Sequence, residues 1–180
     1  MLQITNISFS IQGKPLFEDA SAVIPTGHKV GILGRNGTGK TTLFKLIKKS
    51  LSLDSGTIET PSYFKIGGVE QEAPASNTSL LQTVLEADTE RTHLLQEADT
   101  CEDAERITEI YQRLADIEAY SAEARAASIL AGLGFDNHAQ QRPCHEFSGG
   151  WRMRVALGAV LFSKPDLLLL DEPTNYLDLE

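Results

Sequence analysis

A glycine-rich loop between two apolar segments constrains the fold of this chain more than any other sequence feature. Residues 34–41 read GRNGTGKT, which fits the pattern G-x-x-x-x-G-K-[ST]. Residues 28–33 suit a buried strand, and residues 42–47 suit a helix whose N-terminal dipole faces an anion. In such a loop, backbone N–H groups surround phosphate oxygens, the lysine reaches the outer phosphates and the hydroxyl ligates Mg²⁺. The pattern predicts a nucleotide site rather than an ordinary glycine-rich turn, with Lys40 and Thr41 in the last two roles.

Four leucines followed by two acids predict the chemistry that accompanies this site. Leu167 to Leu170 show no polar alternation, which favours a parallel strand that helices cover on both faces. Asp171 and Glu172 then emerge at its carboxyl end, where open α/β sheets bind ligands. We expect Asp171 to hold Mg²⁺, directly or through water, and Glu172 to polarise the attacking water. Alone, the segment is more typical of a core strand that ends in solvated acids, but the phosphate loop favours the catalytic interpretation.

A second anion site is predicted at Ser148-Gly149-Gly150, just before a helix expected from about Trp151 to Phe162. Serine is also a good N-cap, so a plain helix start is the alternative. A hydroxyl and glycine N–H groups at a helix start can bind an anion. One chain cannot wrap both sites around a single γ-phosphate, whereas two cassettes facing head to tail can.

These motifs together resemble an ATP-binding cassette (ABC) domain. The segments that carry the resemblance are GRNGTGKT, Gln71, FSGGWRMR at 147–154 and LLLLDEPTN at 167–175. More narrowly, residues 147–154 and 171–178 resemble the first cassette of the ABC-F subfamily, whose members are soluble twin-cassette ATPases that act on ribosomes. The resemblance implies an α/β P-loop fold of the ABC type, with an N-terminal β subdomain and a helical insertion. It also implies that residues 1–180 form one ATP-binding domain, truncated after a loop that contains Asp178 and couples the two sites.

The resemblance assigns roles to individual residues. Glu172 and Gln71 are the expected catalytic residues, with Gln71 sensing Mg²⁺ and the γ-phosphate. Thr41, Gln71 and Asp171 are the expected magnesium ligands. The expected nucleotide-binding residues, the last three of which reach ATP on the partner cassette, are Gly34, Arg35, Asn36, Gly37, Thr38, Gly39, Lys40, Thr41, Thr42, Ser148, Gly149 and Gly150.

The sequence departs from the family pattern in three places. Ile11 falls where many members stack an aromatic ring against adenine, although Phe9 lies two residues away, on the same face of a regular strand. Trp151 replaces the glutamine most common after Ser-Gly-Gly in transporters. The chain also stops at Glu180, before the next strand and the histidine that touches the γ-phosphate. We therefore expect this chain alone to hydrolyse little ATP.

The other expected elements are three strands and a helical insertion. The strands are expected at residues 2–11, 20–24 and 57–59, and residues 79–131 should form a helical hairpin that bends near Asp99. A capping box at residues 100–103 is predicted to start the second helix of the hairpin. Four residues form a heptad seam along that helix: Ile107, Ile110, Leu114 and Ile117.

The net charge of the helical insertion limits which partners it can attract. Between Glu86 and Arg125 lie twelve acidic and four basic residues, and this excess accounts for nearly all of the net charge of −9. Such a surface repels phosphate backbones, so it gives no electrostatic support for RNA contact. An arm that touches ribosome or tRNA and an ordinary helical subdomain both remain open.

Composition favours a cytoplasmic chain. Cys101 and Cys144 form no C-x-x-C pair and suggest thiols in a reducing compartment, and the sequence predicts neither a signal peptide nor a membrane span. We therefore expect a cytoplasmic Mg²⁺-dependent ATPase that pairs with a second cassette, possesses no membrane insertion and serves translation. The alternatives are the ATP-binding subunit of a membrane transporter and an ATP-gated binding module with little turnover.

Overall fold

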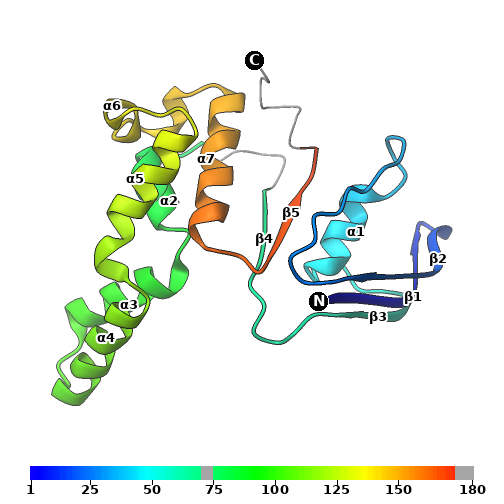
Figure 1. Cartoon of the computed structure of the whole chain (residues 1–180), viewed down its shortest axis with the longest axis horizontal. Helices are drawn as coiled ribbons and strands as arrows, with labels where there is room; N and C mark the ends of the chain where they lie inside the picture. Colours follow the sequence, from blue (N-terminus) through cyan, green and yellow to red (C-terminus); the bar gives the residue numbers. More distant parts are fainter. Residues whose placement is uncertain (70–74, 173–180) are drawn as a thin grey trace. The chain divides into compact units, whose positions relative to one another are not determined.

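The computed structural model describes residues 1–69 and 75–172. Gln71 and residues 173–180, which include Asp178, lie outside these ranges. The chain divides into two compact units, Met1–Ile66 and Gly67–Glu180 (Figure 1).

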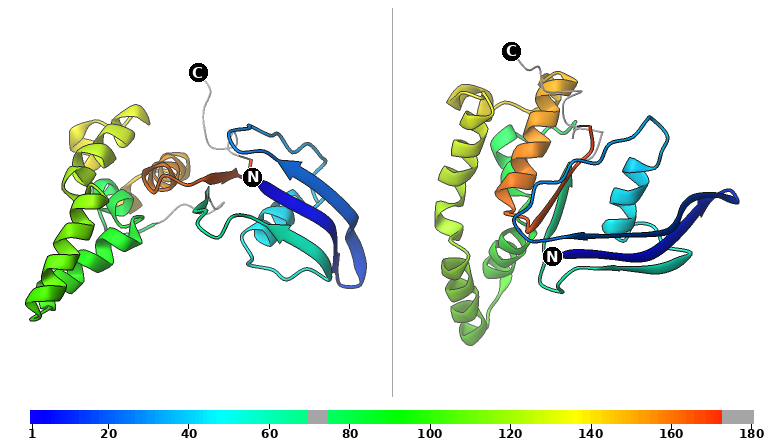
Figure 2. Two further views of the ribbon diagram at one scale, coloured as in Figure 1. Left: turned by 60° about the horizontal axis from the view of Figure 1, so that its bottom comes forward. Right: turned by 45° about the vertical axis from the view of Figure 1, so that its right-hand side comes forward.

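The first unit is an antiparallel sheet with one helix. Strands β1 (Leu2–Ile11), β2 (Lys14–Ile24) and β3 (Ser55–Glu59) form the order β2-β1-β3, and helix α1 (Lys40–Ile47) belongs to the same unit (Figure 2). The strand expected at 20–24 therefore begins earlier, at Lys14, because it pairs with the whole of β1. The buried side chains of this unit come from β1 and α1: Leu2, Ile4, Ile7, Leu46 and Ile47.

One expected strand is not formed. Residues 28–33 have no strand structure, and Val30, Ile32 and Leu33 are 57%, 38% and 96% exposed. Among the described residues, no strand pairing includes this segment. A fully apolar strand requires partner strands and covering layers, since its backbone must be hydrogen-bonded and its side chains buried. The apolar composition was identified correctly, but the prediction of a strand was wrong for this structure.

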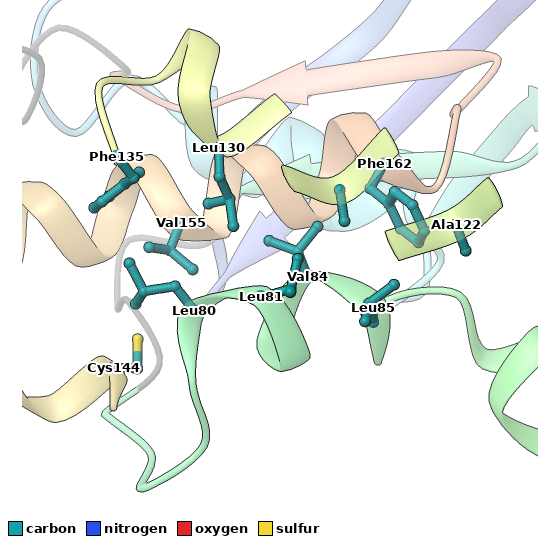
Figure 3. Close-up of a cluster of buried hydrophobic side chains, with 11 residues drawn as sticks. Leu80, Leu81, Val84, Leu85, Ala122, Leu130, Phe135, Cys144, Val155 and Phe162 are labelled. Atoms are coloured by element: carbon teal, nitrogen blue, oxygen red, sulfur yellow. The ribbon is translucent and has the colours of Figure 1, made fainter. Parts of the chain in front are cut away.

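The second unit packs most of its helices around a main core and carries a two-stranded sheet. Its helices are α2 (Leu80–Leu85), α3 (Thr89–Thr100), α4 (Ala104–Asp116), α5 (Ala122–Gly132), α6 (Asn137–Gln140) and α7 (Gly149–Phe162), with short 3-10 turns η1 (Ala119–Ser121) and η2 (Cys144–Glu146). Strands β4 (Ile66–Val69) and β5 (Leu167–Leu170) pair with each other. The main core lies between α2, α5 and α7, where Leu80, Val84, Leu130 and Val155 are fully buried (Figure 3).

The insertion at 79–131 contains more breaks than the single hairpin that was expected. The bend near Asp99 is confirmed, because α3 ends at Thr100 and α4 begins at Ala104. A further break follows α2, where Asp88 caps α3 by accepting a hydrogen bond from Arg91 N–H at 3.1 Å. Another follows α4, where Glu118 takes a left-handed φ of 55°. Residues 79–131 are therefore helices α2 to α5 rather than two long helices.

The hairpin α3–α4 has a small core of its own. Ile110 and Leu114 of the predicted seam are buried and pack with Leu94 of α3 and Ala119, while Ile117 lies at the edge of this cluster. The seam is thus confirmed for these three seam residues, whereas half-buried Ile107 is not part of the cluster. The predicted capping box is wrong: Asp103 is the N-cap of α4, and its carboxylate accepts from Glu105 N–H at 2.9 Å. Thr100 instead ends α3, and its hydroxyl donates to the Gln96 carbonyl at 3.3 Å.

Candidate functional site

The phosphate loop has the backbone that its glycines predict. Gly37 and Gly39 take left-handed φ values of 80° and 96°, which side chains disfavour. The Thr38 hydroxyl donates to the Arg35 carbonyl at 2.8 Å and closes the loop. The Lys40 ammonium donates to the carbonyls of Gly34 and Arg35 at 2.9 and 3.1 Å. The loop therefore curls around the end of the Lys40 side chain.

This geometry fits phosphate groups. Helix α1 begins at Lys40, and Leu43 N–H donates to the Gly39 carbonyl at 2.8 Å in its first turn. The positive end of the helix dipole therefore lies at the loop, and the first turn contains no acidic residue that would oppose an anion. A Cβ on Gly34 would lie 2.7 Å from the Thr38 hydroxyl, so a larger residue there would force the Thr38 side chain to shift. Of the other predicted residues, Asn36 lies in the loop, and Thr41 and Thr42 lie in the first turn of α1.

The two acids lie where β5 ends. Asp171 is half-buried, Glu172 is exposed, and Glu172 has a left-handed φ of 46°. Of the four leucines, Leu169 is buried, at 7% exposed, and the other three are half-buried. The strand and its terminal acids are therefore confirmed, while the expected covering of both faces is incomplete in the described residues.

The Ser-Gly-Gly motif begins helix α7. The helix starts at Gly149, two residues before the predicted start, with Ser148 at the N-cap position. The Ser148 side chain is exposed and makes no capping hydrogen bond within the described part of the chain. The plain capping role that was the alternative is therefore not what this hydroxyl performs here. A hydroxyl at the positive end of a 14-residue helix is suited to contact with an anion.

Aromatic and arginine side chains hold the start of α7. The Trp151 ring packs edge-on against Phe135 with centroids 5.0 Å apart, and the Arg154 guanidinium lies 4.6 Å from the centre of the Trp151 ring. Phe147 also contacts Phe135 edge-on, at 5.8 Å. Sequence reasoning missed Phe135, because it meets these rings only through a turn at Gly134, whose φ is 94°. The four-residue spacing of Phe147 and Trp151 was the sequence signal that could have indicated an aromatic cluster at the start of this helix.

A short antiparallel contact, here called the clasp, joins residues 76–80 to residues 142–145. Cys144 N–H donates to the Thr78 carbonyl at 2.9 Å, and His145 N–H donates to the Ser76 carbonyl at 3.0 Å. On the other side, Leu80 N–H donates to the Arg142 carbonyl at 3.1 Å. Cys144 is buried, and this burial raises the pKa of its thiol. The clasp thus connects the base of the helical insertion to the segment that leads into Ser148.

The predicted site residues therefore fall into two groups. Residues 34–42 lie together in the first unit, whereas Asp171, Glu172 and Ser148 to Gly150 belong to the second. Gln71 lies outside the described residues. Among residues 1–69 and 75–172, no group of three or more His, Cys, Asp or Glu side chains is arranged so that it could hold a metal ion.

Comparisons with known proteins identify relatives of the whole segment. A family model described as ABC transporter matches residues 17–175. Mouse ATP-binding cassette sub-family F member 3 is 45% identical over 188 residues, which cover 98% of this chain and 26% of that protein. The Escherichia coli K12 "Probable ATP-binding protein YheS" is 45% identical over 168 residues, which cover 92% of this chain and 26% of that protein. The chain therefore spans about a quarter of the length of these relatives.

Solved structures share the fold. CbiO1 of Clostridium perfringens, part of the ABC transporter complex CbiONQ, matches with a TM-score of 0.65 at 27% identity, over 98% of this chain and 67% of that chain. A dimeric ATP-binding cassette in a post-hydrolysis state with ADP and phosphate matches with a TM-score of 0.69 at 20% identity, over 99% of this chain and 77% of that chain. No helix in the described residues has both the length and the apolar character needed to cross a bilayer.

Proposed function

The chain belongs to the ATP-binding cassette family and has the α/β P-loop fold of its ATPase domains, and on this basis we propose that it binds Mg²⁺-ATP and takes part in its hydrolysis. The observation that carries the proposal is the loop at 34–42. Its left-handed Gly37 and Gly39, the helix start at Lys40 and the inward Lys40 ammonium together form a phosphate site.

We assign the roles as follows. The loop residues hold the phosphates, and Thr41, Gln71 and Asp171 hold Mg²⁺, which neutralises charge on the phosphate oxygens. Glu172 accepts a proton from the attacking water. Ser148, Gly149 and Gly150 contact ATP bound by a second cassette. These assignments rest on the family motifs and on the local geometry of each group.

For the biological role, we propose a soluble, cytoplasmic twin-cassette ATPase of the F subfamily that acts on ribosomes in translation. The 45% identity to sub-family F member 3 supports this choice. The acidic insertion between Glu86 and Arg125 supplies no attraction for RNA, so charge does not assign the ribosomal contact to this region.

Two other functions compete with this proposal. The fold shared with CbiO1 also suits the ATP-binding subunit of a membrane transporter, in which the helical insertion would dock on a membrane partner. An ATP-gated binding module would keep the phosphate loop but turn over little ATP. Each makes a different prediction for a variant that binds ATP without hydrolysing it.

The test is the Glu172→Gln variant of the full-length protein. Loss of the basic oxygen should lower single-turnover hydrolysis about a hundredfold or more while ATP still binds. With ATP, this variant should co-sediment with ribosomes, and the double variant Lys40→Ala, Glu172→Gln should not. Co-purification with membrane proteins instead would favour the transporter. Hydrolysis by the Glu172→Gln variant at the wild-type rate would show that Glu172 is not the catalytic base.

A further inference from the structure

Two aromatic side chains flank the Ser-Gly-Gly motif, and both pack on one buried ring. Phe147 precedes Ser148, and Trp151 follows Gly150. Both rings contact Phe135 edge-on, with centroids 5.8 and 5.0 Å away. Phe135 is 2% exposed and belongs to the main core (Figure 3), whereas Trp151 is 39% exposed. The motif is therefore attached to the core at both of its ends through the same residue.

The end of α5 fixes the position of Phe135. Phe135 N–H donates to the Leu130 carbonyl at 3.0 Å, and Gly134 N–H donates to the Ala131 carbonyl at 3.1 Å. With a left-handed φ of 94° at Gly134, these two bonds form the Schellman motif that commonly ends a helix. Leu130 is fully buried in the main core. The backbone of Phe135 is thus held by α5, independently of α7.

The start of α7 is held by side-chain packing instead of a serine cap. An N-cap hydroxyl usually fixes a helix start by accepting a backbone hydrogen bond, but within the described part of the chain Ser148 makes no such bond. The Arg154 guanidinium lies 4.6 Å from the centre of the Trp151 ring and covers it, and the Arg152 guanidinium donates to the Phe147 carbonyl at 3.1 Å. This packing fixes the helix start without using the Ser148 hydroxyl.

Resting on the proposed function, we propose that Trp151 is a positioning residue for hydrolysis. Through its contact with Phe135, it holds Ser148 to Gly150 where they meet the ATP on the second cassette. Misplacing a group that acts in the transition state by about 1 Å can lower a rate about a hundredfold. Loss of the Trp151 ring therefore impairs hydrolysis through Ser148, whereas the phosphate loop of the same chain is not involved.

The test is a double-mutant cycle in the full-length protein. Single-turnover ATP hydrolysis is measured, and the fraction that Ser148→Ala slows is assigned to the site that Ser148 serves. Trp151→Ala should slow this fraction about tenfold, but less than about twofold further when Ser148 is already alanine. Trp151→Phe, which keeps an aromatic ring, should stay within about threefold of the wild type. Affinity for a fluorescent ATP analogue at the Lys40 loop should change less than about twofold in every variant.

A matched control separates positioning from stability. Leu94→Ala removes a buried side chain from the separate core of the α3–α4 hairpin, so it should lower the thermal midpoint without slowing hydrolysis. If Trp151→Ala does not fold, Trp151→Leu takes its place in the cycle with the same expected result, because leucine keeps apolar bulk and lacks the ring.

The outcomes separate this inference from the proposed function. Wild-type hydrolysis by Trp151→Ala would overturn it, as would a loss that adds in full to that of Ser148→Ala, since Trp151 would then not act through the motif. A loss in Leu94→Ala as large as that in Trp151→Ala would also overturn it. If Ser148→Ala slows no fraction of the hydrolysis, the proposed contact of Ser148 with ATP itself fails, and the inference fails with it.

Discussion

Lys40 connects the shape of the phosphate loop to its charge. Its ammonium donates to two loop carbonyls, those of Gly34 and Arg35, and so keeps the loop curled. The same ammonium carries a positive charge, and the loop curls around it. Removing the side chain should therefore remove both the positive charge of the loop and the two hydrogen bonds that keep it curled.

We expect Lys40→Ala to weaken ATP binding at this site by at least about tenfold, since hydrogen bonds to charged groups contribute about 1.5–3 kcal/mol. Titration with a fluorescent ATP analogue measures the change. Lys45→Ala is the matched control, because Lys45 is an exposed base in the last turn of the same helix. Equal affinities of the wild type and Lys40→Ala would contradict the assignment of the loop.

The loop residues and the acids at 171–172 could be predicted because each motif is a run of contiguous residues whose types indicate the chemistry. The Phe135–Trp151–Arg154 stack could not, since it depends on a turn at Gly134 that no local pattern predicts. The roles of the site residues remain predictions.

At the scale of elements, period and composition predicted most helices and strands, including β1, α7, β5 and three of the four seam residues at α4. Two kinds of error occurred. The strand at 28–33 failed because a strand depends on its partners, which no local pattern supplies. The capping box failed because several polar residues near Asp99 can cap a helix, and the observed turn selects Asp103.

The observed and the predicted N-cap of α4, Asp103 and Thr100, can be compared directly by substitution. Asp103→Ala should destabilise the chain by about 1 kcal/mol, because it removes the acceptor for Glu105 N–H. Thr100→Ala should cost clearly less, since Thr100 does not cap α4 and its hydroxyl donates to carbonyls of its own helix. Urea unfolding monitored by circular dichroism measures both variants. A larger effect for Thr100→Ala would restore the predicted capping box.

The α3–α4 hairpin also predicts a dependence on pH. Arg106 donates to both carboxylate oxygens of Glu97, at 2.7 and 3.0 Å, and this lowers the pKa of Glu97 below its ordinary value of 4.5. A carboxylate whose pKa is lower in the folded state stabilises the fold above the unfolded pKa. That stabilisation is lost as the pH falls through the folded pKa.

We therefore expect Glu97→Gln to be less stable than the wild type at neutral pH, by a small amount because the pair is exposed. The difference in free energy of unfolding should shrink as the pH falls below about 4. Glu102→Gln, an exposed acid of the α3–α4 turn, is the control and should show a smaller change with pH. A Glu97→Gln difference that stays constant down to pH of about 2 would refute the linkage.

At the scale of the whole molecule, the family match and the F-subfamily relatives confirm the family predicted from the motifs. The likeness to solved cassettes confirms the fold class. The pairing with a second cassette remains a prediction, and Ser148 is the residue that tests it.

Ser148→Arg in the full-length protein should block contact with ATP on the partner cassette, because a long charged side chain would fill the start of α7. Nucleotide affinity at the Lys40 loop should stay within about twofold of wild type, whereas steady-state hydrolysis should fall about a hundredfold at the site that Ser148 serves. Ser50→Arg, at an exposed position after α1, is the matched control. Full hydrolysis by Ser148→Arg would show that turnover does not need the head-to-tail contact.

The separate core of the α3–α4 hairpin has an evolutionary consequence. Leu94, Ile110 and Leu114 pack with each other rather than into the cluster of α2, α5 and α7. The clasp between residues 76–80 and 142–145 meanwhile closes the base of the insertion by backbone hydrogen bonds that require no particular side chain. Insertions or deletions of whole helical turns in α3 and α4 can thus accumulate in a lineage without disturbing the start of α7. The length of the α3–α4 hairpin can therefore differ between relatives while the nucleotide chemistry stays the same.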